Sequence, residues 1–101
     1  MSNFAVRMQH GPRWDPARGT REQDGWDEHA SFMDALLADG FVIFGGPLGQ
    51  PAGEDGALIA VEAPDEQAIR DRLAADPWAP AGLLAIDSVQ AWPLWLDSRA
   101  S

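Results

Sequence analysis

Apolar residues alternate with other residues close to the start of the chain, which is the pattern of a β-strand with one buried face. We expect this strand over residues 4–9. Residues 10–19 contain two prolines and two glycines, a composition that favours a loop. The side chains that share the apolar face of the strand are Phe4, Val6 and Met8.

The clearest periodic pattern follows this loop, where apolar side chains recur at the spacing of one helical face. Thr20 and Gln23 have the spacing of a capping box, and Asp24 is a second candidate N-cap. We therefore expect a helix that begins near these residues and ends at Asp39, with Gly40 at the C′ position. The face that we expect to be buried carries His29, Phe32, Met33, Leu36 and Leu37.

The second half of the chain predicts a hairpin, a helix and a last strand. Residues 41–44 and 57–62 are short apolar runs that we expect to pair, and the Gly45-Gly46-Pro47-Leu48 segment is expected to end the first of them. A helix is expected to begin at Pro64-Asp65, with acidic residues where the helix dipole favours them, and to stop at Asp76-Pro77. The last strand is expected over residues 83–92.

This order of elements, βαββαβ, predicts an α+β fold of the ferredoxin-like type. In that fold an antiparallel sheet carries both helices on one face. The second face of the first strand includes Ala5 and is therefore partly apolar. We expect a homodimer that stacks the two helix-free sheet faces.

Composition narrows the classes of function. The chain has 101 residues, which we interpret as a single domain over residues 1–101, and its formal net charge is −9. This charge argues against binding to nucleic acid or to an anionic membrane surface, both of which need a cationic footprint. There is no cysteine, so thiolate catalysis and cysteine-ligated metals are excluded.

Further absences shape the expectations for location and cofactors. No apolar run approaches the ~20 residues of a membrane helix, and no secretory signal is recognisable, so a cytoplasmic location is expected. Two histidines and scattered carboxylates make no metal-ligand signature, and no glycine-rich phosphate loop stands at a strand–helix turn. We expect neither a metal nor an organic cofactor.

The candidate chemistry centres on His29. A titratable ring lies where apolar side chains are expected, and a buried imidazole needs a partner. Asp76 is the candidate partner, because a carboxylate can fix the tautomer of the ring while the other nitrogen moves protons. The alternative is a structural histidine, with Asp76 only ending a helix.

Four further residues are candidates for substrate binding. The N–H groups of Gly45 and Gly46 can approach an anionic or enolate oxygen, and Pro47 would line the same site; a simple strand-ending turn or bulge is the alternative. Trp78 is a candidate wall for an aromatic pocket or, equally, a core residue. His10 is either a second proton carrier or a solvated loop residue.

The chain resembles the YCII-related family, small proteins of the dimeric α+β barrel superfamily. The resemblance covers residues 4–92 and implies a ferredoxin-like dimer with a His–Asp pair in a cleft, which on matching positions is His29 with Asp76. The chain departs from the pattern in its arginines, since the nearest ones before His29 are Arg18 and Arg21. The segments that carry the resemblance are His29, residues 36–40, Gly45-Gly46-Pro47-Leu48, residues 56–62, Ala75-Asp76-Pro77-Trp78 and Ala81-Gly82-Leu83.

Two functions follow as hypotheses. The first is a cofactor-independent enzyme of lyase or isomerase type, in which His29 and Asp76 transfer a proton on a small, cyclic or aromatic molecule. The second is a non-catalytic dimeric module that binds a small molecule or accompanies another protein. An open pocket at His29 favours the enzyme, whereas a cleft filled by the side chains of Trp26 and Trp78 favours the module.

Overall fold

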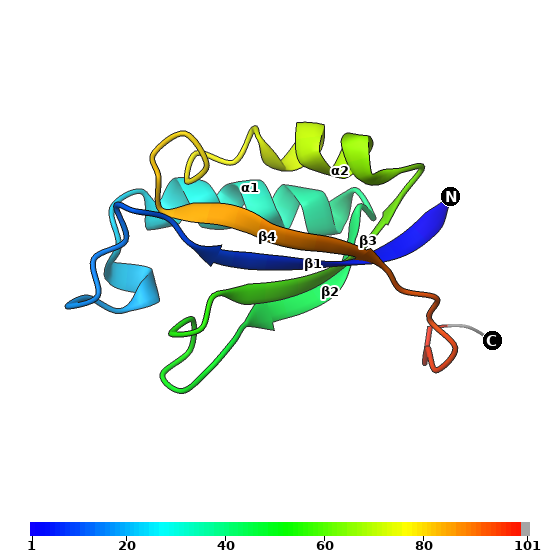
Figure 1. The fold of residues 1–101 in the computed structure, drawn as a ribbon, viewed down its shortest axis with the longest axis horizontal. Helices are drawn as coiled ribbons and strands as arrows, with labels where there is room; N and C mark the ends of the chain where they lie inside the picture. Colours follow the sequence, from blue (N-terminus) through cyan, green and yellow to red (C-terminus); the bar gives the residue numbers. More distant parts are fainter. Residues whose placement is uncertain (100–101) are drawn as a thin grey trace.

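The computed structural model describes residues 1–99 of the chain, so residues 100–101 of the predicted domain lie outside the described part. Four strands form one antiparallel sheet in the order β2-β3-β1-β4. Helices α1 and α2 both lie over the same face of this sheet (Figure 1), so the predicted ferredoxin-like α+β fold is confirmed. The elements are β1 (Ser2–His10), η1 (Thr20–Glu22), α1 (Trp26–Ala38), β2 (Val42–Pro47), β3 (Ala57–Ala63), α2 (Glu66–Leu73) and β4 (Leu84–Ala91).

The core fills the space between the sheet and the two helices. Val6 and Met8 of β1 are buried, while Arg7 and Gln9 between and after them are exposed, as the alternation predicts. The helices contribute few but fully buried side chains, because each presents a narrow apolar stripe to the sheet. These are Leu36 of α1 and Ile69 and Leu73 of α2, which join Ile59 and Val61 of β3 in one cluster.

The start of α1 differs from the prediction. The helix begins at Trp26, and its N-cap is Gly25, which has a φ of 77° and no side-chain capping bond. Thr20 opens a separate one-turn 3-10 helix instead, and the side chain of Gln23 bonds to an upstream loop. The predicted capping box and the alternative cap at Asp24 are therefore wrong, because these side chains have tertiary partners.

The end of β2 also differs. Gly45, Gly46 and Pro47 stay in register with β3 and do not break the strand. An irregularity between Val42 and Phe44 comes earlier in β2. A proline is tolerated at this point because β2 is an edge strand, where half of the backbone N–H groups face away from the sheet.

The other helix ends agree more closely with the sequence. Gly40 follows α1 with a φ of 83°, as expected for a C′ glycine. The Asp65 carboxylate accepts a hydrogen bond from the Ala68 N–H at 2.9 Å and caps α2. None of the helices in residues 1–99 is long and apolar enough to cross a bilayer.

The face of the sheet opposite the helices carries an apolar patch, which we call the helix-free patch and define as Phe44, Leu58, Ala60 and Trp92. Phe44 and Trp92 make an edge-to-face contact with ring centroids 5.9 Å apart. A groove of about 250 Å³ runs among these side chains. Leu58 lies near the centre of this face, paired in register with Arg7 of β1.

Candidate functional site

A cavity of about 620 Å³ lies between α1 and strands β2 and β3. Most of its lining is apolar, and its aromatic walls come from segments far apart in the sequence. Concave, apolar sites of this size with a few polar groups are typical of small-molecule binding. The aromatic side chains that line it are His10, Trp14, Trp26, His29, Phe44 and Trp78.

His29 lines this cavity and meets Asp76 behind its wall. His29 stands in the first turn of α1, and Asp76 lies in the turn that follows α2. The Nδ1 of His29 lies 2.9 Å from Oδ1 and 2.8 Å from Oδ2 of Asp76. Because an ionised carboxylate only accepts, this contact places the proton of the neutral ring on Nδ1. Both residues are buried, with exposures of 8% for His29 and 2% for Asp76.

The second nitrogen of His29 faces the cavity. Nε2 has no hydrogen-bond partner among residues 1–99. Every buried side-chain nitrogen and oxygen in that part of the chain has a partner, so Nε2 cannot be one of the buried atoms. Nε2 is therefore accessible, and His29 is one of the residues that line the cavity. The arrangement leaves a basic lone pair at the surface of a largely apolar chamber.

Trp78 packs face to face on the imidazole of His29 and fixes the orientation of that ring. The two rings are stacked with centroids 4.0 Å apart and an interplanar angle of 4°. The indole Nε1 donates to the carbonyl of Asp24 at 2.8 Å, and the backbone N–H of Trp78 donates to Oδ1 of Asp76 at 2.9 Å. Trp78 is 2% exposed, so it is both a core residue and the support of the His–Asp pair.

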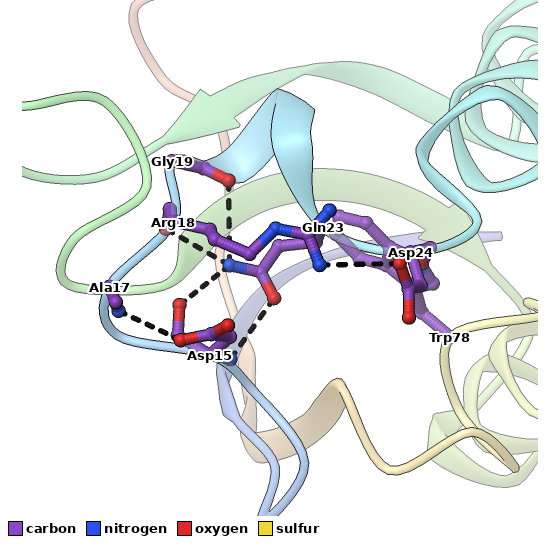
Figure 2. A network of polar contacts seen from close by, with 7 residues as sticks. All are labelled: Asp15, Ala17, Arg18, Gly19, Gln23, Asp24 and Trp78. Carbon is purple, nitrogen blue, oxygen red and sulfur yellow. Dashed lines mark hydrogen bonds and ion pairs between the residues drawn. The ribbon is translucent and has the colours of Figure 1, made fainter.

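Gln23 positions the loop beside the cavity and was not identified from the sequence as a site residue. Its side chain is buried, and Nε2 donates to the carbonyls of Asp15 at 2.8 Å and Arg18 at 3.0 Å. Its Oε1 accepts from the Asp15 N–H at 3.0 Å. Figure 2 shows this amide closing the loop next to the segment whose carbonyl holds Trp78. A lone buried glutamine has no periodic signature, which is why the pattern did not reveal it.

His10 lines the same cavity from the end of β1. It is half-buried and ends a strand, so the prediction that it is a solvated loop residue is wrong. Its Nε2 donates to the Gly53 carbonyl at 2.6 Å, and its ring stacks on Trp14 at 3.8 Å. The hydroxyl of Thr20 donates to the Ala52 carbonyl at 2.8 Å. These two bonds tie the β2–β3 loop to the edge of the cavity.

Gly45, Gly46 and Pro47 line the cavity as part of the edge strand. The N–H of Leu48 donates to the Gly56 carbonyl at 2.8 Å, and bonded positions alternate along an antiparallel pair. Following that alternation, the N–H of Gly46 bonds to β3, whereas the N–H of Gly45 points away from β3. Of the two glycine amides that the sequence suggested, the one at Gly45 is thus free of the ladder.

Alanine is expected to affect stability differently at Gly45 and at Gly46. A Cβ on Gly45 would lie 2.6 Å from both Cγ2 of Ile59 and the carbonyl oxygen of Leu58, whereas one on Gly46 meets nothing within 4 Å. Gly45→Ala is therefore expected to lower the free energy of unfolding by about 1–3 kcal/mol, the range for overpacking, and Gly46→Ala to change it little. Urea denaturation of both variants measures this, and equal midpoints would contradict it.

Within residues 1–99, no group of three or more histidine and acidic side chains is arranged to hold a metal ion. Trp26 completes the wall of the cavity beside His29, with ring centroids 5.9 Å apart. The site is therefore built from one His–Asp pair, a stack of aromatic rings and the backbone of an edge strand.

Comparison with known proteins gives a family and a fold. A family model described as the YCII-related domain matches residues 5–93. Among solved structures, 5-chloro-2-hydroxyhydroquinone dehydrochlorinase from Burkholderia phenoliruptrix AC1100, in complex with 2,5-dihydroxybenzoquinone, is similar with a TM-score of 0.63 and 21% identity. The likeness covers 91% of this chain and 93% of that chain, and at this identity it shows a common fold. No curated protein matches the chain.

Proposed function

The chain belongs to the family of YCII-related domains, and on this basis we propose that it is an enzyme that transfers a proton on a small cyclic or aromatic molecule without an organic cofactor. One observation carries the proposal. Nδ1 of His29 is fixed by a buried carboxylate, while Nε2 faces a cavity of about 620 Å³. Histidine is the side chain best suited to proton transfer near neutral pH.

The geometry supports a reaction of lyase or isomerase type. Nε2 of His29 takes a proton from a carbon or oxygen of the substrate. The electron pair left behind forms a new π bond to the neighbouring carbon, while a conjugated carbonyl π pair shifts onto its oxygen or the bond to a leaving group breaks. Asp76 balances the positive charge that the imidazole then carries. The cycle closes when Nε2 returns the proton to another atom, which isomerises the substrate, or to a leaving group that departs with its own electron pair. No electron acceptor is needed.

The lining of the cavity supports a flat substrate. Trp14 and Trp26 are half-buried and offer aromatic surface, and an aromatic ligand gains from offset or edge-to-face contacts with such rings. The similar dehydrochlorinase was solved with a dihydroxybenzoquinone, and that ligand is of the same chemical kind. The non-catalytic alternative is less well supported, because Trp78 packs flat on His29 and leaves the cavity open.

Exchange of carbon-bound protons with solvent tests the proposal without knowledge of the natural substrate. We expect the protein to accelerate the exchange of the α-protons of 1,4-cyclohexanedione in D₂O, because these protons are acidic and the molecule is a small neutral ring. His29→Gln keeps an N–H for Asp76 but removes the base, so the accelerated exchange is expected to fall by about 10²–10⁴-fold. Proton NMR follows the exchange. Undiminished exchange in His29→Gln would refute the assignment.

We also propose that a second copy of the chain covers the helix-free patch. Phe44 is 48% exposed there, next to the groove of about 250 Å³. In a two-fold arrangement of stacked sheets, each copy presents the same apolar patch to the other. A domain of this size buries a modest share of its surface alone, so association stabilises it further.

A charge in the middle of this patch tests the dimer. Sedimentation is expected to give twice the chain mass of 10.9 kDa for the unmodified protein. Leu58→Glu is expected to give the single mass, because a carboxylate in an apolar interface between two copies is costly. Gln67→Glu on the exposed side of α2 is the matched control and is expected to leave the mass unchanged. A monomeric unmodified protein would contradict the proposal.

A further inference from the structure

Asp34 is distinctive because it is the only acidic or basic side chain, histidines aside, among the described residues that line the cavity. It lies on α1, five positions after His29, and it is exposed. Met33 and Leu37 on the same helix also line the cavity. Asp34 is therefore an exposed carboxylate in the lining of a chamber whose other residues, apart from Thr20, are apolar, aromatic or glycine.

No arginine lines this cavity, although the chain has seven basic residues, all of them arginines. The guanidinium of Arg21 lies 6.0 Å from the centroid of the Trp26 ring, and the backbone N–H of Arg13 bonds to the Gly82 carbonyl. The other five are ion-paired with carboxylates outside the cavity lining. These pairs are Arg7–Asp87, Arg18–Asp24, Arg70–Glu66, Arg72–Asp39 and Arg99–Asp97.

The inner end of the cavity does not supply a net positive charge either. When His29 is protonated, its charge is balanced by Asp76 at 2.8 Å. The whole chain has a formal net charge of −9, so an anion meets a repulsive potential from a distance as well. Enzymes that bind carboxylate or phosphate groups usually provide a cation or a fork of donors for them.

We propose that Asp34 determines the charge of the ligand, so that the cavity takes neutral hydroxylated rings and rejects rings that carry a carboxylate. This inference rests on the proposed function in one respect, namely that the cavity is where a small ring binds. It adds that the substrate reaches His29 uncharged. A hydroxyl is then the group that meets Nε2, since the lone pair of Nε2 accepts a hydrogen bond and a hydroxyl is the donor that an uncharged ring offers.

Two probes of equal ring size test this: 1,4-hydroquinone, which is neutral at pH 7, and 2,5-dihydroxybenzoate, which adds one carboxylate. Their dissociation constants are measured by titration calorimetry at low salt for the unmodified protein, Asp34→Asn and Asp34→Lys. The unmodified protein is expected to prefer hydroquinone. Asp34→Asn is expected to reduce that preference roughly two- to fivefold, the effect of one charge near the surface, and Asp34→Lys to reduce it by about the same factor again.

Asp27→Asn is the matched control, because Asp27 is exposed on the same helix and does not line the cavity. It removes the same charge and is expected to leave the preference unchanged. The effect of Asp34→Asn is also expected to shrink in 1 M salt, where the Debye length is about 3 Å.

The outcomes separate the two proposals. The role of Asp34 is overturned if hydroquinone binds but Asp34→Asn leaves the preference for it unchanged. It is also overturned if Asp27→Asn changes that preference as much as Asp34→Asn does. In both cases the proposed function still stands. If neither probe binds, and neither shifts the NMR resonances of the His29 ring, the aromatic ligand class is overturned and this inference fails with it.

Discussion

Asp76→Ala is expected to lower the free energy of unfolding by about 2–6 kcal/mol, because two buried donors lose their acceptor at roughly 1–3 kcal/mol each. Asp76 is 2% exposed and accepts hydrogen bonds from both the imidazole of His29 and the backbone N–H of Trp78. Without the carboxylate, both donors are left in a dry environment. Chemical denaturation of the variant measures the loss.

Asp76→Asn separates this structural role from catalysis. Its amide oxygen still accepts from the Trp78 N–H and from Nδ1 of His29, so the loss of stability is expected to be well below that of Asp76→Ala. The negative charge that balances the imidazolium is gone, however, and proton exchange on a cyclic ketone is expected to fall by about 10²–10⁴-fold. If Asp76→Asn keeps full exchange activity, Asp76 has only a structural role.

Trp78→Ala is the second large effect, with an expected loss of about 3–5 kcal/mol for truncating a buried tryptophan. The indole is 2% exposed, stacks on His29 at 4.0 Å and contacts the Trp14 and Trp26 rings at 5.8 Å. Its removal leaves a void behind the imidazole. Thermal and urea denaturation are the measurements.

Trp78→Phe is the informative partner of this variant. Phenylalanine keeps an aromatic face for His29 but cannot donate to the Asp24 carbonyl, so we expect a smaller loss of about 1–3 kcal/mol for the unsatisfied acceptor. Because the imidazole loses part of its support, the histidine ring resonances are expected to broaden or shift in NMR spectra. A Trp78→Ala variant as stable as the Trp78→Phe variant would show that the stack contributes little.

Local sequence patterns predicted the order of the strands and helices, because the spacing of apolar residues that marks each element depends on neighbouring residues alone. The alternation of β1 and the capping carboxylate of Asp65 survive in the structure. The stripe of α1 survives in part, since His29 and Leu36 are buried whereas Leu37 is exposed. The errors occur where a side chain has a distant partner. Thr20 bonds to Ala52 and Gln23 to Asp15, and neither contact has a signal in the local sequence.

The candidate pair shows the same division. Periodicity placed His29 on the buried face of α1. Asp76 was a candidate because a buried imidazole needs a partner, and the family resemblance implied the same residue, since no local rule links positions 47 residues apart. The prediction that a glycine-proline segment ends β2 was wrong because the rule for proline in strands depends on whether the strand is at an edge. Sheet order is a property of the whole fold and was not read from that segment.

The β2–β3 loop, which is hydrogen-bonded by the side chains of His10 and Thr20, has a consequence for how such a protein changes over evolutionary time. The loop is held together by its own backbone bonds, among them Gly53 N–H to Leu48 and Glu54 N–H to Pro51. It contributes Gly53 and Gly56 to the cavity but touches neither member of the His–Asp pair. Insertions and deletions in this hairpin can therefore change the lining of the cavity while the His–Asp pair stays intact, so the loop is the segment at which new ligand preferences are most readily introduced.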